Sequence, residues 1–300
     1  MSEAPSYTYT AQDVNQAAED ISTELFFGKT ADTVPKILIT AGVEGSGKTY
    51  LLEKNLLPSG RYANYVRLYL PAYREKHPQY AEIIKLGVLH AYQHTEAFTR
   101  ELCGKIFAKA LELKYNIIME CAFDEIHFAG IAKFVPGYQL EVHVVGCNHA
   151  FAHISSIKRA LDSLGKQELE RFVSYARVES SIGNAPAVLI AFEYLARTVS
   201  GSQIYLYERG LGELKDRVLR AHTTYTLDAK GELTETSVVQ PYSYSGYDAI
   251  LRRTIYSMEE RDEAVKACHL LLLRINKYRE QVPDFVYNDL YSYITKYVYR

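Results

Sequence analysis

The sequence predicts an α/β protein in which a mostly parallel sheet is covered by helices on both faces. Short apolar runs rich in β-forming residues alternate with longer stretches of helical periodicity, which is the rhythm of a parallel sheet. One of these runs leads directly into a glycine-rich turn and then into a helical stretch. Hydrophobic residues make up 48% of the 300 positions, which is enough for one large core.

The first 33 residues are predicted to form a helical segment ahead of the main domain. Residues 1–12 are polar and show no apolar periodicity. From Asp13, the expected N-cap, apolar residues recur at helical spacing until Gly28 closes the stretch. We expect this amphipathic helix to pack on the domain rather than to recruit a partner. Its apolar face consists of Val14, Ala17, Ala18, Ile21 and Leu25.

The glycine-rich turn follows a strand expected at 34–41. Gly42 and Gly47 bracket four residues, and Lys-Thr follows, which is the spacing G-x-x-x-x-G-K-[ST] of a phosphate-binding loop, or P-loop. Glycines let the backbone curl so that N–H groups point at phosphate oxygens, and a helix expected at 48–56 adds the positive end of its dipole. The alternative is a chance glycine turn, but the strand and helix on either side argue against it.

This loop predicts binding of a nucleoside triphosphate, taken as ATP, together with Mg²⁺. Lys48 would reach the β- and γ-phosphates, and the Thr49 hydroxyl would hold the metal ion. A short apolar run at 116–120 ends in Glu120, the pattern of a second magnesium-organising carboxylate, although an ordinary strand terminus would look the same. We predict Thr49 and Glu120 as metal ligands. The predicted nucleotide contacts are Gly42, Val43, Glu44, Gly45, Ser46, Gly47, Lys48, Thr49 and Tyr50.

The other expected elements complete a P-loop kinase-type domain at 34–210 and a C-terminal extension at 211–300 of unknown role. The stretch at 71–80, a loop or short helix, follows the second strand at the edge of the sheet where ligands bind in open α/β folds. The expected strands are 62–70, 116–120, 138–147 and 203–209, the expected helices are 88–113, 148–163, 166–176, 186–199, 257–279 and 284–298, and a small hairpin is expected within 211–246.

Composition narrows the partners and the compartment. A net charge of −2 and an isoelectric point near 6.5 predict binding neither to nucleic acid nor to an anionic membrane. No apolar run approaches the roughly 20 residues of a membrane span, and the first residues lack a signal-peptide pattern. The cytoplasm is therefore the expected location. The four cysteines form no C-x-x-C pair and fit free thiols in a reducing compartment.

A zinc site is a weaker hypothesis for one short segment. His149 and His153 stand four residues apart, so they share one helix face, and Cys147 lies close in sequence. A fourth ligand is not evident nearby, and the segment opens a helix that should cover the sheet. We therefore do not assign a zinc ion.

The order of motifs resembles a known family. After the phosphate loop come Tyr-Arg-Glu-Lys-His-Pro-Gln-Tyr at 73–80 and Asn-Ile-Ile-Met-Glu-Cys-Ala at 116–122, followed by a strand and helices that bring up Arg159 and Arg177. This series resembles the zeta toxin family, P-loop kinases of UDP-N-acetylglucosamine with relatives that act on other small molecules. The first stretch is similar to the family's [FY]-[RK]-x-x-H-P-x-[YF], and the second to its strand ending in Glu-Gly-Thr. His77 would be a structural or substrate-side residue.

Three substrate-side positions depart from the family pattern. The family's general base is an Asp where this chain has Pro71, and proline has no side-chain acid or base chemistry. The threonine after the family's Glu-Gly pair becomes Ala122. A helix glutamate that contacts the sugar falls on Gly104, by an ungapped count of sixteen residues before Glu120. The nucleotide half is thus kept, and the acceptor half is rebuilt or abandoned.

The resemblance implies that Arg159 and Arg177 clamp phosphate. An arginine can offset charge on the transferring phosphoryl group through its fork of donors. The alternative is a solvated helix face, since Lys158 and Arg171 lie close by in sequence. For Arg159 both interpretations stay open. Arg177 is favoured as functional because it precedes a glycine-containing turn expected at 178–184.

An active enzyme would need a replacement for the missing base. Asp124 and Glu125 lie just past the third strand, at the ligand-binding edge. Asp124 is our candidate, and the alternative is an ordinary helix N-cap. Phosphoryl transfer is mostly positioning and electrostatics, so a displaced carboxylate, or none, could suffice at a lower rate. The predicted catalytic residues are Lys48, Asp124, Arg159 and Arg177.

Two functions follow from these observations. The first is an ATP/Mg²⁺-dependent small-molecule kinase of zeta-toxin type, acting on a nucleotide-sugar or another nucleotide-like acceptor. The second is a catalytically silent nucleotide-binding protein that serves as an interaction or switch module. The resemblance also suggests an antitoxin-like protein partner. In the silent module, the region after residue 210 would meet a protein partner of unspecified kind.

Overall fold

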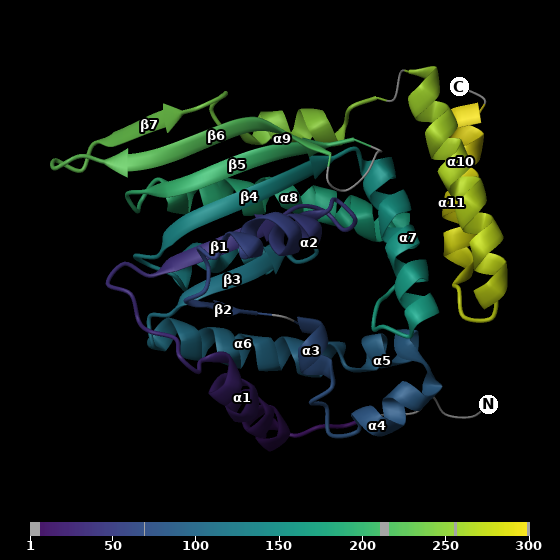
Figure 1. Cartoon of the computed structure of the whole chain (residues 1–300), viewed down its shortest axis with the longest axis horizontal. Helices are drawn as coiled ribbons and strands as arrows, with labels where there is room; N and C mark the ends of the chain where they lie inside the picture. Colours follow the sequence, from purple (N-terminus) through teal and green to yellow (C-terminus); the bar gives the residue numbers. More distant parts are fainter. Residues whose placement is uncertain (1–6, 69, 211–215, 255–256, 299–300) are drawn as a thin grey trace.

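The computed structural model describes residues 7–68, 70–210, 216–254 and 257–298, and they build one central sheet with helices around it (Figure 1). The strands are β1 Lys36–Ala41, β2 Tyr65–Arg67, β3 Asn116–Cys121, β4 Gln139–Cys147, β5 Ser202–Arg209, β6 Arg217–Leu227 and β7 Leu233–Ser237. The α-helices are α1 Ala11–Leu25, α2 Lys48–Leu51, α3 Leu70–Arg74, α4 Tyr80–Ile83, α5 Val88–His94, α6 Glu96–Glu112, α7 His149–Lys166, α8 Tyr175–Ala196, α9 Tyr244–Leu251, α10 Met258–Ile275 and α11 Asp284–Val298. Shorter helical turns are η1 Leu52–Leu56, η2 Leu57–Ser59, η3 Ile84–Leu86, η4 Ile126–Lys133 and η5 Asn276–Tyr278.

The sheet has seven strands in the order β2-β3-β1-β4-β5-β6-β7. β1 pairs in parallel with both β3 and β4, and the pairs β2–β3 and β4–β5 are also parallel. β6 and β7 add an antiparallel hairpin to the β5 edge. The predicted fold class, a mostly parallel sheet with helices on both faces and a C-terminal hairpin, is confirmed. Strand order reverses at β1, which is where ligands bind in folds of this kind.

The central strand is buried on both faces because helices cover each side. Figure 1 shows α2 in front of β1, with α8 and α9 behind the sheet. Ile37 and Ile39 belong to the large core. Leu38 points to the opposite face and packs with Leu52 and Ile118. A strand buried on both sides reads as a continuous apolar run, which explains the Ile-Leu-Ile sequence of β1.

The C-terminal helices α10 and α11 form a hairpin that lies along α7 (Figure 1). The buried His153 of α7 has a ring nitrogen 2.8 Å from the hydroxyl of Tyr293 on α11, and its other ring nitrogen is 2.8 Å from the carbonyl of Val173. The backbone N–H of Tyr175 donates to Asp289 at 3.1 Å. These polar contacts tie the end of the chain to the segment between α7 and α8. The division at residues 33 and 210 stays a prediction.

The first helix begins earlier than expected, and its cap is Thr10 rather than Asp13. The Thr10 side chain accepts from the backbone N–H of Asp13, whose carboxylate accepts in return from the backbone N–H of Thr10. This is a capping box, which satisfies two backbone donors at once.

Changing Thr10 to alanine removes one half of this box. We expect the free energy of unfolding to fall by about 1 kcal/mol, the usual contribution of an N-cap side chain. Urea denaturation followed by circular dichroism would measure the change. Thr23, an exposed residue whose hydroxyl bonds within the same helix, provides the control variant Thr23→Ala, for which we expect no comparable loss.

Three other expected elements differ in the structure. The helix expected at 88–113 is broken at Thr95, whose hydroxyl donates to the carbonyl of Ala91 at 2.7 Å and which becomes the N-cap of α6. The second strand is only three residues long. The helix expected at 166–176 is wrong, because Gln167 takes a left-handed conformation (φ 62°) and ends α7.

The turn expected at 178–184 is also wrong. These residues lie inside α8, a helix of 22 residues. Val178 and Ile182 are buried against the core from this helix, so packing outweighs the helix-breaking tendency of Gly183. In the described part of the chain, no helix is both long and apolar enough to cross a lipid bilayer.

Candidate functional site

The glycine-rich turn follows β1 at the carboxyl edge of the sheet and adopts a conformation that needs its glycines. Gly45 and Gly47 have φ values of +78° and +95°, which favour glycine. A Cβ added to Gly45 would lie 1.9 Å from the carbonyl oxygen of Ala152 in α7, and one added to Gly42 would lie 2.6 Å from the carbonyl of Val145. The backbone of the loop is therefore packed tightly between β4 and α7.

Two buried polar atoms of this loop lack a hydrogen-bond partner in the described part of the chain. The Ser46 hydroxyl and one carboxylate oxygen of Glu44 are buried, and neither has a hydrogen-bond partner within the part of the chain that the structure describes. Lys48, the first residue of α2, is only 8% exposed. Buried polar atoms normally find partners in protein or water. The unpartnered Ser46 hydroxyl is a donor, and beside the buried Lys48 ammonium it fits an anionic ligand, whereas the Glu44 carboxylate has the opposite charge preference.

Thr49 and Glu120, the two predicted metal ligands, are in direct contact. The Thr49 hydroxyl donates to the Glu120 carboxylate at 2.6 Å, because β3 is the parallel neighbour of β1 and both strands end at the same edge. Arg67 approaches the other carboxylate oxygen at 3.9 Å. A hydroxyl and a carboxylate beside a phosphate site are the oxygen ligands that Mg²⁺ uses, with phosphate oxygens and water completing its shell. The pair fits this ion.

Two further arginines contact the loop, one at the end of β5 and one at the start of β6. Neither was predicted from the sequence. Arg209, 2% exposed, donates to the carbonyl of Gly45 at 2.7 Å and to the Ser155 hydroxyl at 2.7 Å. Arg217 donates to the carbonyl of Gly47 at 3.5 Å and lies over the ring of Tyr50, 5.1 Å from its centroid. The only signal in the sequence was the position of Arg209 at the end of an expected strand.

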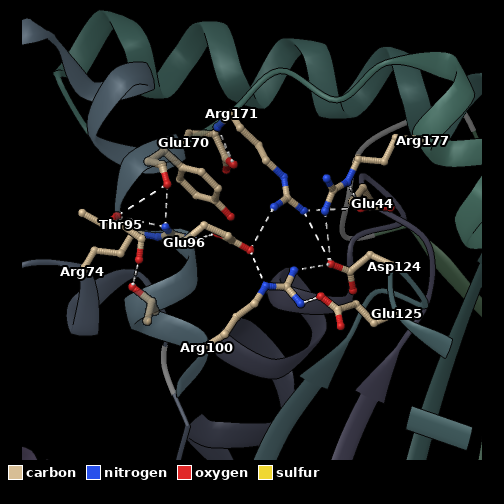
Figure 2. Close-up of polar contacts among 12 residues, drawn as sticks. Glu44, Arg74, Thr95, Glu96, Arg100, Asp124, Glu125, Glu170, Arg171 and Arg177 are labelled. Atoms are coloured by element: carbon tan, nitrogen blue, oxygen red, sulfur yellow. Dashed lines mark hydrogen bonds and ion pairs between the residues drawn. The ribbon is translucent and has the colours of Figure 1, made fainter. Parts of the chain in front are cut away.

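A cluster of arginines and carboxylates lies beside the loop (Figure 2). Arg177, in the first turn of α8, is 3.4 Å from Asp124 and 3.8 Å from Glu44. Arg171, between α7 and α8, is 3.8 Å from Asp124 and 3.5 Å from Glu44. Arg100, on α6, is 3.5 Å from Asp124. The arginine cluster therefore converges on one carboxylate from three elements.

The backbone after β3 aims Asp124 into this cluster. Phe123 is buried and has a φ of +61°, a left-handed conformation that is rare for a large side chain. Its carbonyl accepts from the Asn184 side chain at 3.0 Å, so α8 holds the turn in place. The next residue, Glu125, forms an ion pair with Arg100, and one of its carboxylate oxygens lies 2.7 Å from a ring nitrogen of His127. The turn thus directs two consecutive carboxylates toward α6 and α8.

A second layer of polar contacts extends the cluster toward α3. Arg74 is 1% exposed, donates to the carbonyl of Tyr92 at 2.7 Å and to the Thr95 hydroxyl at 3.1 Å, and forms an ion pair with Glu96. Glu96 also pairs with Arg100 at 2.8 Å. Burial would raise the pKa of Glu96, but hydrogen bonds and charge from Arg74 and Arg100 outweigh it and leave the pKa lowered. Glu96 is thereby held as a carboxylate.

The arginine cluster borders an open pocket of about 600 Å³. Its walls come from α6, from the turn after β3, from η4 and from α8, and one of its lining residues, Arg177, also approaches Glu44 of the glycine-rich loop. This volume lies in the range of small-molecule sites. The pocket is lined by Arg100, Asp124, Glu125, Ile126, His127, Arg177, Ser180 and Asn184.

The structure brings some predicted site residues together and leaves others apart. Asp124 and Arg177 lie in the arginine cluster, but Arg159 is exposed on α7 and pairs with Glu170 at 2.8 Å. Pro71 lies in α3, and Gly104 is exposed on α6, with open space where a Cβ would stand. Neither position supplies a polar side chain. The roles of these residues stay predictions.

The family-like motif at 73–80 is held by aromatic packing. His77 is 3% exposed, and its ring accepts from the backbone N–H of Gln79 at 3.1 Å. Tyr9 and Phe98 meet the ring edge to face, at 5.6 and 5.1 Å between centroids. Burial lowers the pKa of His77. These contacts favour the structural interpretation of this histidine.

The hypothetical zinc ligands do not converge. Cys147 is buried at the end of β4. Both ring nitrogens of His153 are already in hydrogen bonds, one with the Tyr293 hydroxyl and one with the Val173 carbonyl. His149 has a ring nitrogen 3.3 Å from the carbonyl of Leu251. Within the described residues, no group of three metal-ligating side chains gathers anywhere.

Together the fold and the loop define the class of protein. A parallel sheet with the strand order 2-3-1-4-5, a glycine loop after its central strand and a carboxylate on the neighbouring strand that meets the loop threonine are the features of a P-loop kinase-type protein. More narrowly, the chain belongs to the zeta toxin family, whose family model matches residues 22–210. A search of curated protein sequences found no matching relative.

Several solved structures share this fold, and one of them belongs to a toxin–antitoxin system. A structure of the PezAT chromosomal toxin–antitoxin system of Streptococcus pneumoniae shares 17% identity with a TM-score of 0.60, and covers 90% of this chain and 98% of its own. The AvrRxo1-ORF1:AvrRxo1-ORF2 complex with sulphate ions shares 12% identity (TM-score 0.53), covering 94% of this chain and 86% of its own. The same complex with ATP shares 11% identity (TM-score 0.52), with 94% and 86% covered.

Proposed function

We propose that the protein is an ATP/Mg²⁺-dependent phosphotransferase of zeta-toxin type. The observation that carries this proposal is the hydrogen bond between Thr49 and Glu120 beside a glycine loop that tolerates no Cβ at Gly45. Membership in the zeta toxin family supports the same activity. A structural neighbour solved with ATP adds support for this nucleotide.

Each residue in and around the loop has a separate role in the proposed phosphoryl transfer. Lys48 and the loop amides hold the β- and γ-phosphates, while Thr49 and Glu120 hold Mg²⁺, which offsets phosphate charge when bound. Arg177 and Arg171 stand beside the loop, where a guanidinium can stabilise charge on the transferring group. Arg159 would need to leave Glu170 to take part.

The acceptor is proposed to be a nucleotide-sugar or another nucleotide-like metabolite. The pocket beside the loop contains Arg100 and Arg177, and arginine recognises phosphate through paired donors. Since Pro71 stands where the family has its base, Asp124 is the proposed replacement. Three arginines surround its carboxylate, so positioning by these arginines carries much of the catalysis in this proposal.

An antitoxin-like protein is the proposed macromolecular partner. Two of the structural neighbours are a toxin–antitoxin system and a two-component ORF1:ORF2 complex. The part of the chain after residue 210, which includes the exposed strand β7, is the region that we propose for such contacts. The proposed compartment is the cytoplasm.

A catalytically silent nucleotide-binding module is the second candidate. The observation that favours it is Pro71, which removes the family's proton acceptor from α3. In this case the loop would bind ATP, and the fold would act as an interaction or switch module.

The deciding experiment measures phosphate transfer from Mg-ATP by purified protein, alone and with a metabolite extract. We expect transfer to an extract component by the wild type and its loss in Lys48→Ala, because the ammonium that holds the β- and γ-phosphates is missing. Lys54→Ala, at an exposed lysine in η1, is the matched control and should keep the activity. Binding of ATP without turnover in any mixture would favour the silent module, and equal binding by wild type and Lys48→Ala would refute both functions.

UDP-N-acetylglucosamine tests the family's own acceptor in the same assay. We expect little or no stimulation, because Pro71 and Gly104 supply neither the base nor the sugar contact. Stimulation comparable with that by the extract would show that the family's chemistry persists by another route.

A further inference from the structure

Glu44 is an unusual residue for the middle of a phosphate loop because it carries the charge of the expected ligand. It is 3% exposed, and one of its carboxylate oxygens has no hydrogen-bond partner in the described part of the chain. Repulsion between this carboxylate and a bound triphosphate would weaken binding, unless neighbouring positive charges offset it. Burial of an unpaired carboxylate would also destabilise the fold.

The partners of Glu44 all come from one segment of the chain. Arg171 and Arg177 approach the same carboxylate oxygen, at 3.5 and 3.8 Å, and the Ser181 hydroxyl donates to the other oxygen at 3.1 Å. Figure 2 shows both guanidinium groups beside Glu44. Glu44 is therefore a direct link between the phosphate loop and the segment that runs from the end of α7 into α8.

This segment depends on side-chain contacts for its position. Residues 168–174 have no regular secondary structure, so no helical or strand ladder fixes Arg171. The carbonyl of Val173 is held by His153, and Glu170 pairs with Arg159. On the side that faces the loop, Arg171 pairs with Glu44, with Asp124 and, at 3.9 Å, with Glu96.

We infer that Glu44 is a positioning residue that docks Arg171 and Arg177 on the phosphate loop before the nucleotide arrives. This inference rests on the proposed function, because it gives the two arginines their place beside the terminal phosphate. Glu44 holds the guanidinium groups within reach of the loop in the free protein. When the triphosphate binds, its oxygens compete with Glu44 for the guanidinium donors of Arg171 and Arg177. Glu44 therefore positions the two arginines but lowers the affinity for the triphosphate.

Hydrogen–deuterium exchange of the free protein tests the docking directly. Glu44→Gln keeps the shape of the side chain and removes its charge, so we expect faster exchange in peptides covering residues 168–182. Arg171→Gln, which removes the charge from the other side, should open the same peptides. Glu112→Gln, at an exposed residue of α6, is the control and should leave them unchanged. Unchanged exchange in Glu44→Gln would overturn the inference.

The affinity for Mg-ATP separates a positioning role from a structural one. Removing a negative charge beside the triphosphate should make Glu44→Gln bind Mg-ATP about three- to tenfold more tightly, by titration calorimetry. A purely structural role predicts weaker binding together with a lower melting temperature, and this result would also overturn the inference. If Lys48→Ala binds Mg-ATP like the wild type, the proposed function fails, while the exchange data still decide whether Glu44 docks the arginines.

Discussion

Gly45→Ala is expected to abolish Mg-ATP binding and to destabilise the protein by about 3–5 kcal/mol. The new methyl group would lie 1.9 Å from the carbonyl oxygen of Ala152, a backbone atom of α7 that has no rotamer to change. Either α7 must move away from the sheet, or the loop must leave the conformation that directs its N–H groups inward. Both outcomes destroy the phosphate site.

Gly60→Ala is the matched control for this prediction. Gly60 has a φ of +73°, close to the +78° of Gly45, but nothing lies within 4 Å of the place where its Cβ would stand. Its substitution therefore carries the conformational penalty alone, about 1–2 kcal/mol. Urea denaturation and calorimetry on both variants would isolate the clash. Equal effects of the two substitutions, or a Gly45→Ala protein that binds Mg-ATP normally, would contradict the packing of α7 on the loop.

The strand, glycine-rich turn and helix around residue 45 could be predicted from the sequence because the main requirements of this turn are local. Gly45 and Gly47 take positive φ values, a local demand that the glycine pattern reveals without a fold, whereas the close approach of α7 to Gly45 could not be read from the sequence. The pairing of Thr49 with Glu120 needed one further step. Parallel neighbours end at the same edge of a sheet, so an acid at the end of the next expected strand had to lie nearby.

The arginines around the loop could not be predicted, because their partners are distant in sequence. Arg209 meets the carbonyl of Gly45 across 164 positions, and nothing near Arg209 marks this contact. From the sequence, Arg171 has no assigned role and counts only as a neighbour in favour of a solvated helix face around Arg159 and Arg177. It lies in the arginine cluster because α7 ends at Gln167, a left-handed residue where glycine would have signalled the end. The positions of Arg209 and Arg171 are therefore set by tertiary contacts.

Two sets of contacts fix the loop, and they differ in kind. Arg209 and Arg217 donate to backbone carbonyls, so they stabilise the shape of the loop whatever is bound. Arg171 and Arg177 instead pair with the Glu44 side chain, a contact between charges that a phosphate can replace. On one side of the loop, Arg209 and Arg217 form backbone contacts that a ligand does not replace. On the other side, Arg171 and Arg177 form charge pairs with Glu44 that a phosphate can replace. Substitutions that change the charge of Glu44, Arg171 or Arg177 should therefore alter ligand affinity more than they alter the free energy of unfolding.

Arg74→Met is expected to lower the free energy of unfolding by about 3–5 kcal/mol at pH 7, because it leaves the partly buried Glu96 without its main partner. Arg74 also supplies donors to the carbonyl of Tyr92 and to Thr95, and its guanidinium lies 3.6 Å from the centroid of the Tyr92 ring. Arg252→Met, at a surface pair with Asp248, is the control and should leave the unfolding transition unchanged.

The loss caused by Arg74→Met should depend on pH in a defined direction. The pKa of Glu96 is lowered in the folded protein, so its contribution to stability is complete above the unfolded pKa of roughly 4.3 and is lost as pH falls through the folded pKa. In Arg74→Met the Glu96 carboxylate keeps Arg100 but loses Arg74, so its pKa should rise and the carboxyl should take up a proton at a higher pH than in the wild type. The difference between wild type and variant should therefore shrink below about pH 5, measured by urea denaturation across pH. A difference that stays constant down to pH 4 would show that the contacts of Arg74 with the carbonyl and ring of Tyr92 on α5, rather than its charge pair with Glu96, account for the loss of stability.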